Sequence, residues 1–259
     1  MLSYQHGYHA GNFADVHKHT ALCLLLKHFA NEPKLVTYVD SHAGRGQYDL
    51  TGDQARKIGE WKDGISKFTT QSVNADALKL YLSAISDFQE KHTEQTYPGS
   101  PALMHQMMQP NDRGVLFELH PAEYIELRKA LEFDKRLRIL DKNAMEFLVD
   151  YLPNRKSPGA LLIDPSYELK DEYQTIAHLA KLTHKRWPSG VVMVWYPMLP
   201  AKRHIELKEG LKGAQFFELV GPEKERGMYG TGLAIYNFPE SLEESFLEAQ
   251  DEMQRTLFG

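Results

Sequence analysis

Short apolar runs alternate along the chain with longer segments whose apolar residues recur at helical spacing. The runs are bounded by glycine, proline or an acidic residue, which is typical of buried strands in a parallel sheet. They predict strands at residues 35–39, 114–118, 136–141, 160–163, 190–198 and 214–221, and a last strand within 227–239. This alternation indicates an α/β fold with about seven strands, mostly parallel, and helices on both faces. Because the last two strands follow each other closely, an antiparallel hairpin is expected at the edge of the sheet.

Residues 49–97 interrupt the alternation. Two segments there, 55–68 and 75–92, are amphipathic and helical in period. We therefore expect a small helical insertion subdomain at 49–97 that covers the site, within a core formed by 1–48 and 98–259.

Two helix starts are visible in the sequence. A helix started by Asn12 or Asp15 is expected from about Ala14 to Phe29, because an apolar run begins there. A second helix is expected at Ser100, with Ser100 as the N-cap and Pro101 in the first helical position.

Composition narrows the class of protein. The chain has 259 residues, of which 42% are hydrophobic and 25% are charged, as in an ordinary soluble globular protein. The single cysteine, Cys23, excludes an intrachain disulfide and lies in an apolar run, which favours a buried thiol and a reducing compartment. The N-terminal stretch has no signal-peptide core and no segment is long enough to span a bilayer, so we expect a cytoplasmic protein outside the membrane.

The net charge of −5 argues mildly against nucleic acid as a partner, although a local basic face would suffice to bind one. Basic residues do gather in three clusters, within 128–138, 181–186 and 202–212. For any one cluster taken alone, a solvated helix face is the simpler interpretation.

The segment 159–168, GALLIDPSYE, holds the most informative chemistry. Its apolar run ends at Asp164, Pro165, Ser166 and Tyr167, so this tetrapeptide is expected at the carboxyl end of a central strand, where open α/β sheets bind ligands. The tetrapeptide suits transfer of a group to a planar exocyclic amine, whose lone pair is delocalised into its ring. The alternative is a plain strand-ending turn, because Asp and Pro are turn residues.

Each residue of the tetrapeptide can be given a role in such a transfer. The Asp164 carboxylate and the Pro165 carbonyl would accept the two hydrogens of the amine and draw its lone pair towards the electrophile. Tyr167 could stack on the base, which is worth ~1–3 kcal/mol. Catalysis would then come from positioning and preorganised electrostatics.

A second motif follows the first strand. Asp40 is followed by Ala43-Gly44-Arg45-Gly46, and the glycines permit a tight turn and close approach to a ligand. This is no dinucleotide fingerprint, since Asp49 replaces the third glycine, and no phosphate-binding loop. The pattern D-x-x-x-G-x-G after a strand is common to methyltransferases that use S-adenosylmethionine. Glu118, at the end of the next strand, suits hydrogen bonds to ribose hydroxyls.

The first 20 residues are rich in histidine. His6, His9, His17 and His19 do not form a metal-binding pattern, because His17 and His19 are two residues apart and there is no HExxH. We expect no metal site, and instead a polar pocket wall of His, Tyr and Lys18.

Taken together, these segments resemble a known family. The start MLSYxHxxHAGNxADVxKH, DxHAGxGxY at 40–48, YPGSP at 97–101, ELHP at 118–121 and the IDPxYE segment are similar to the ribosomal RNA large subunit methyltransferase J family. These bacterial enzymes methylate the exocyclic amine of one adenine in 23S rRNA. The resemblance implies a Rossmann-like class I methyltransferase core, S-adenosyl-L-methionine as donor, and cytoplasmic action on RNA.

The resemblance also assigns site residues by position. It implies Asp164 as the catalytic residue and Tyr4, His6 and Lys18 near the RNA substrate. Together with the motifs above, the expected cofactor-binding residues are His19, His42, Gly44, Ser100, Glu118, Asn143, Ala144 and Asp164.

Two positions depart from the family pattern. Ser166 replaces a second proline, which leaves both proposed acceptors in place. Asn143-Ala144 replaces the common Asp-Gly, which keeps an acceptor for the adenine of the cofactor but removes a charge.

The sequence therefore predicts methyl transfer from S-adenosylmethionine to adenine in 23S rRNA by a monomeric enzyme. Two rivals stay open at this point. One is a methyltransferase for DNA adenine or protein glutamine, which uses a similar tetrapeptide. The other is a cofactor-binding or RNA-binding protein that has lost catalysis.

Overall fold

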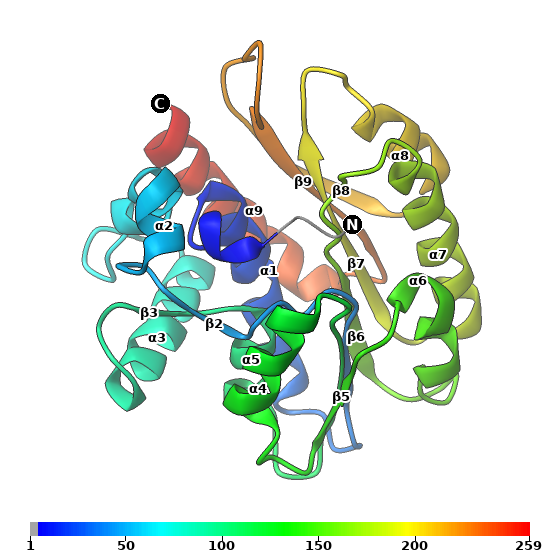
Figure 1. Cartoon of the computed structure of the whole chain (residues 1–259). Coiled ribbons are helices and arrows are strands. Elements are labelled where there is room, and N and C mark those ends of the chain that lie inside the picture. Colours follow the sequence, from blue (N-terminus) through cyan, green and yellow to red (C-terminus); the bar gives the residue numbers. More distant parts are fainter. Residues whose placement is uncertain (1–4) are drawn as a thin grey trace.

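The computed structural model describes residues 5–259, built around one seven-stranded sheet (Figure 1). The order across the sheet is β5-β4-β1-β6-β7-β9-β8. The first five strands are parallel, and β9 runs antiparallel to both of its neighbours. The strands are β1 Thr37–Asp40, β4 Arg113–Phe117, β5 Leu137–Leu140, β6 Gly159–Ile163, β7 Val191–Met198, β8 Gln215–Val220 and β9 Gly230–Tyr236. The predicted, mostly parallel α/β sheet is confirmed.

The expected antiparallel hairpin at the edge of the sheet is confirmed. β8 and β9 do pair, but β9 lies inside the sheet between β7 and β8, and β8 forms the edge. Every residue of β9 is buried, whereas β8 has several half-exposed positions, as suits an edge strand. The sequence did not say which of the two strands also pairs with the rest of the sheet, and this strand is β9.

Helices cover both faces of the sheet, which Figure 1 shows as one group on the left and another on the right. Because strand side chains alternate between faces, Ala160 and Leu162 of β6 join the first group, and Leu161 and Ile163 join the second. The first group contains α1 Phe13–Phe29, α3 Asp76–Lys91, α4 Ser100–Met107, α5 Pro121–Leu131 and α9 Glu240–Phe258. The second contains α6 Ala144–Phe147, α7 Glu172–Arg186 and α8 His204–Gly210. A 3-10 turn, η4 Leu148–Tyr151, follows α6.

Helix α1 is buried on nearly all sides. It is packed among the sheet, α3, α4 and α9, and its polar residues Asp15, His17, Lys18 and His19 are as buried as its leucines. Asn12 caps its first turn by accepting a hydrogen bond from the Asp15 amide at 3.0 Å. The helix therefore delivers charged side chains into the interior of the protein.

The region between β2 Gln47–Asp49 and β3 Thr96–Pro98 holds α2 and α3. The two strands pair antiparallel, a small ladder that the sequence did not predict. Helix α3 was predicted to within a residue, but the segment 55–68 is broken into α2 Asp53–Ile58 and the 3-10 turns η2 Glu60–Asp63 and η3 Ile65–Lys67. Gly59 ends α2 in the left-handed region at φ 76°, where glycine is favoured. The division of the chain at 49 and 97 stays a prediction.

The insertion region is attached to distant parts of the chain. The Glu252 carboxylate of α9 accepts hydrogen bonds from the Asn74 and Ala75 amides, at 2.9 and 2.7 Å, just before α3. The Ile65 amide bonds to the Gly11 carbonyl at 2.8 Å. Within residues 5–259, no helix combines the length and the apolar character needed to cross a membrane.

Candidate active site

Three acidic side chains stand at the carboxyl ends of parallel strands. Asp40 is the last residue of β1, Glu118 directly follows β4, and Asp164 directly follows β6. Because these strands are parallel neighbours, the three side chains meet at one edge of the sheet. Lys18 of α1 and Ser100 of α4 reach the same edge, through contacts with Asp164 and Asp40 respectively.

The Asp164 carboxylate is bound by a buried ammonium group. Lys18 Nζ donates to Asp164 Oδ2 at 2.6 Å and lies 2.9 Å from Asp15 Oδ1. Burial by itself would lower the pKa of Lys18, but the two carboxylates outweigh it and raise that pKa above its usual value. The ammonium therefore stays charged and ties α1 to the end of β6.

Asp15 is the second partner of this ammonium and is only 1% exposed. Burial acts to raise the pKa of Asp15, but His6, Lys18 and His19 together hold it well below its usual range. Its Oδ2 also accepts from the Gly11 amide at 2.9 Å and lies 2.9 Å from His6 Nε2. Asp15 was not among the predicted site residues, although the Asn12-x-x-Asp15 spacing of a capped helix start marked it.

The predicted N-terminal residues have different surroundings. His6 contacts Asp15 and packs edge-on against Tyr48, with ring centroids 5.1 Å apart. His19 is fully buried against the Tyr97 hydroxyl at 3.0 Å, and burial lowers its pKa to about 3. Tyr4 lies outside the described residues. Across residues 5–259, no group of three or more His, Cys, Asp or Glu side chains is arranged to hold a metal ion.

Asp40 is fully buried at the end of β1. Ser100 Oγ donates to its Oδ2 at 2.6 Å, and the His42 amide donates to its Oδ1 at 3.1 Å. Burial raises the pKa of Asp40 to about 7, against the lowering effect of the Ser100 hydrogen bond. The expectation that Ser100 is the N-cap of α4 was wrong. Ser100 is the first residue of the helix, its hydroxyl donates to Asp40, and Gly99 is the N-cap.

His42 follows Asp40 in the loop after β1. Its Nδ1 lies 2.7 Å from the Ser41 hydroxyl. Burial lowers the pKa of His42 to about 4, although the charge of Asp164 opposes this shift. The imidazole is therefore neutral near pH 7.

Glu118 faces this loop and is held by backbone amides. The Gly44 amide donates to Oε2 at 2.7 Å, and the His120 amide donates to Oε1 at 2.6 Å. Burial raises the pKa of Glu118 to about 7, although both amides oppose this. Gly44 has φ 61°, and a Cβ there would stand 2.3 Å from the Tyr48 hydroxyl, so only glycine fits.

These carboxylate oxygens suit a sugar. Each oxygen of Glu118 accepts one amide hydrogen and keeps a second lone pair, which matches two adjacent ribose hydroxyls. These hydrogen-bond acceptors thus fit the nucleoside part of S-adenosylmethionine.

The residues of the tetrapeptide after β6 have different surroundings. Pro165 is buried, and no residue in 5–259 donates a hydrogen bond to its carbonyl or to Asp164 Oδ1. Tyr167 adopts φ 52° and is 7% exposed, and its hydroxyl donates to the Trp195 carbonyl at 2.7 Å. Its ring packs on Tyr173, with centroids 4.4 Å apart. Tyr167 is thus anchored to β7 and α7.

Trp195 of β7 was missed by the sequence analysis. Its half-buried ring lies 5.6 Å from Lys18 Nζ, and its Nε1 donates to Thr231 Oγ1 at 2.7 Å. The sequence did not mark Trp195 as a candidate site residue, because it lies within an apolar strand. Only the order of strands in the sheet places β7 beside β6.

Asn143 and Ala144 stand after β5, at the start of α6. Asn143 Oδ1 accepts from the Met145 amide at 3.0 Å, and Nδ2 donates to Glu146 at 2.9 Å. The side chain of Asn143 is therefore used as a helix cap, and Ala144 is buried beside it.

This fold and edge define a class of enzyme. Counted among the seven strands of the main sheet, the order is 3-2-1-4-5-7-6 with the seventh reversed, and acidic residues end the first two strands. That is the architecture of a class I methyltransferase, which uses S-adenosylmethionine.

The comparison with known families makes the assignment specific. Residues 33–258 match the model of the family described as RsmJ, Ribosomal RNA large subunit methyltransferase D, RlmJ, and the chain belongs to this family. It is thus an S-adenosylmethionine-dependent methyltransferase.

Individual relatives cover nearly the whole chain. A Haemophilus influenzae protein named Ribosomal RNA large subunit methyltransferase J is 32% identical over 265 residues, 99% of this chain and 94% of its own. An Escherichia coli K12 protein of the same name is 35% identical over 251 residues, 94% and 90% of the two chains. The crystal structure of protein LPL1258 from Legionella pneumophila is 32% identical, with a TM-score of 0.87 over 96% of this chain and 94% of that one.

Proposed function

We propose that this chain transfers the methyl group of S-adenosylmethionine to the exocyclic amine of a specific adenine in 23S rRNA. The observation that carries the proposal is the state of Asp164. One of its oxygens is fixed by Lys18 at 2.6 Å, and the other has no donor among the described residues. A carboxylate held in this way is ready to accept a hydrogen from the substrate.

The geometry supports direct transfer. Asp164 Oδ1 and the Pro165 carbonyl accept the two hydrogens of the amine, so that its lone pair is directed at the methyl group. The bound cofactor supplies an electrophilic methyl on a positively charged sulfur. The new N–C bond would form as the S–CH3 bond breaks, so that the sulfur leaves as a neutral thioether. The nitrogen would then lose one proton, with Asp164 as the proposed acceptor. Lys18 acts as a positioning residue for Asp164. Tyr167, whose ring centroid lies 5.9 Å from that of Trp195, stacks on the base in this proposal.

The cofactor roles follow the edge of the sheet. In the proposal, Glu118 binds the ribose, and Asn143 with Ala144 faces the adenine. His42, Gly44 and Ser100 line the methionine end, close to Asp164. His19 supports this edge from the interior, next to Asp15.

The RNA side of the site rests on the relatives. Both are named large subunit ribosomal RNA methyltransferases. Tyr4, His6 and Lys18 stay the proposed residues near the target nucleotide. The target base must be unpaired or flipped to reach Asp164. Action in the cytoplasm as a monomer also stays part of the proposal.

An acceptor panel tests the proposed function. Purified protein and radiolabelled S-adenosylmethionine are incubated separately with 23S rRNA from cells lacking the gene, 16S rRNA, adenine-containing DNA and a cellular protein extract. Label confined to 23S rRNA and recovered as N6-methyladenosine is the expected result. Label on DNA or on protein glutamine would show that the substrate belongs to another class. Cofactor binding without label on any acceptor would contradict catalysis.

A further inference from the structure

In two of the three basic clusters of the sequence, most of the cations pair with neighbouring acids. In the first cluster, Arg128, Lys129 and Arg136 pair with Glu132, Glu126 and Asp134. In the third, the cations Lys202, Arg203 and Lys208 pair with Glu223, Glu206 and Glu218. These clusters have the environment of ordinary solvated helix faces.

The middle cluster is different. Lys181, Lys185 and Arg186 are exposed on α7, and none forms an ion pair with any described residue. The loops beside the end of α7 add further exposed cations without an ion pair in residues 5–259. We call the whole set the α7 basic surface: Lys181, Lys185, Arg186, Arg155, Lys156 and Lys212.

Hydrogen bonds join these segments into one surface. Arg155 Nη1 donates to the Lys185 carbonyl at 3.0 Å, and Ser189 Oγ donates to the Arg155 carbonyl at 2.8 Å. The Tyr236 hydroxyl donates to the Lys212 carbonyl at 3.4 Å, and the Tyr236 ring stacks on His184 of α7 at 4.4 Å. The three loop segments, 154–157, 185–190 and 211–214, contain no acidic residue.

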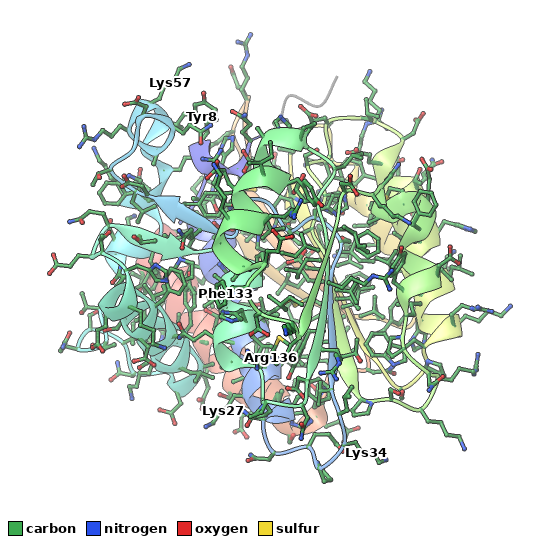
Figure 2. All side chains as sticks on the ribbon, turned by 60° about the horizontal axis from the view of Figure 1, so that its bottom comes forward. Tyr8, Lys27, Lys34, Lys57, Phe133 and Arg136 are labelled. Atoms are coloured by element: carbon green, nitrogen blue, oxygen red, sulfur yellow. The ribbon has the colours of Figure 1, made fainter. Side chains whose placement is uncertain are left out.

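This surface lies at the edge of the sheet opposite the active site. The three loop segments precede β6, β7 and β8, so they stand at the amino ends of strands whose carboxyl ends lie towards Asp164. Figure 2 brings this amino edge forward, with Lys34 and Arg136 there and with Tyr8 and Lys57 at the far end of the molecule. At about 3.3 Å per residue, the length of β6 alone separates the two edges by ~16 Å.

We propose that the α7 basic surface binds phosphates of the same ribosomal RNA, at a distance from the target adenine. The inference rests on the proposed function, because it deepens the description of that substrate. β6 and β8 are three strand spacings apart, about 14 Å, which spans several phosphates of one strand. Unpaired cations on an acidic protein attract a polyanion by releasing its counterions, without reading bases.

The surface has a consequence for substrate size. An RNA must extend around the molecule to touch both edges, so a short hairpin around the target can fill only the active site. A longer rRNA fragment gains the additional phosphate contacts. We expect the longer fragment to have a lower KM, with kcat unchanged, because the additional contacts are the same in the ground state and the transition state.

The test compares two triple variants with equal charge change. K181Q/K185Q/R186Q removes three charges from the α7 basic surface, and R128Q/K129Q/K135Q removes three charges elsewhere. Methylation of a long 23S rRNA fragment and of a short target hairpin is measured across a salt series. For the first variant we expect kcat/KM on the long fragment to fall about tenfold and the salt slope to shrink by about 2, with the hairpin unaffected. The control variant should match the wild type on both RNAs.

The possible outcomes separate the two proposals. If the two variants have the same kcat/KM on the long fragment, RNA binding by the α7 basic surface is overturned. The proposed function still stands in that case, provided that the wild type methylates the RNA. If the wild type methylates neither RNA, the proposed function fails, and filter binding of the long fragment still decides the surface. Weaker binding by the first variant alone supports it, and identical binding by both overturns it.

Discussion

Three carboxylates at the ends of β1, β4 and β6 share one edge of the sheet, but each has different hydrogen-bond partners. Asp40 is bound by a hydroxyl and an amide, Glu118 by two amides, and Asp164 by an ammonium. Lys18 donates to one oxygen of Asp164 and leaves the other without a donor among the described residues. The neutral partners leave Asp40 and Glu118 with pKa values raised by burial to about 7.

The raised pKa of Glu118 predicts pH-dependent binding of the cofactor. An ionised Glu118 accepts hydrogen bonds from ribose hydroxyls, so affinity for S-adenosylmethionine should rise through pH 7 and level off above about pH 8. Binding should therefore release protons below pH 7. Isothermal titration calorimetry in two buffers measures both quantities.

The matched variant is Glu118→Gln, which keeps the shape and removes the titration. We expect it to bind the cofactor about tenfold more weakly at pH 8 and to lose most of the proton release. The stability of the cofactor-free protein is a second measurement, and it should change with pH in the opposite direction to the cofactor affinity. Between pH 4.5 and about 7 the folded state holds more protons on Glu118 than the unfolded state, so this group lowers the free energy of unfolding as pH rises. A cofactor affinity in Glu118→Gln equal to wild type would contradict the ribose role.

The sequence predicted where the candidate site residues that follow strands lie, since a strand end in a parallel sheet fixes where a side chain lies. Asp164, Glu118 and the loop of Gly44 were found in this way. Partners that arrive through tertiary packing were not found. Asp15 and Trp195 belong to elements whose neighbours depend on the whole fold.

At the scale of elements, α1 is the unusual one, because it carries buried charges through the centre of the protein. Lys18 links it to β6, and Asp15 links it to the segment before it. Its limits were predictable from Asn12 and from the apolar run, as were those of α3. Its burial on all sides was not predictable, since the covering comes from α3 and α9, which are far away in sequence.

Substitution of Glu252 measures how much its contact with the insertion region contributes to the free energy of unfolding. Its carboxylate is 8% exposed and accepts from the amides of Asn74 and Ala75, which precede α3. Glu252→Ala leaves two amide donors without an acceptor and should lower the free energy of unfolding by about 2–3 kcal/mol. Glu252→Gln retains an acceptor oxygen and should lose less than half of that. Urea unfolding measures both, and equal losses in the two variants would contradict the capping role.

At the scale of the molecule, acidic and basic side chains gather at opposite edges of the sheet. The carboxyl edge gathers the acidic residues of the site, and the amino edge near α7 carries unpaired cations. The alternation of apolar runs predicted the strands and both helical layers. It did not predict that β9 lies between β7 and β8, because all of these strands have similar apolar patterns, and pairing is decided by packing.

The surface predicts a monomer. The basis of this prediction is that the large apolar side chains that are exposed, such as Leu35, Ile58, Phe133 and Leu169, are spread over separate elements. Light scattering at micromolar concentration should give one species near 29.7 kDa. A stable species of twice that mass would contradict the prediction.

The most direct test of the account is the single-turnover rate of Asp164→Asn on 23S rRNA. The variant keeps the size of the side chain but replaces the carboxylate that faces the amine and pairs with Lys18. With cofactor affinity within about twofold of wild type, we predict that the rate of methyl transfer falls at least ~100-fold. Asp150→Asn, at an exposed position of η4, should leave the rate unchanged. A folded Asp164→Asn protein that transfers the methyl group at the wild-type rate would contradict the central role given to Asp164.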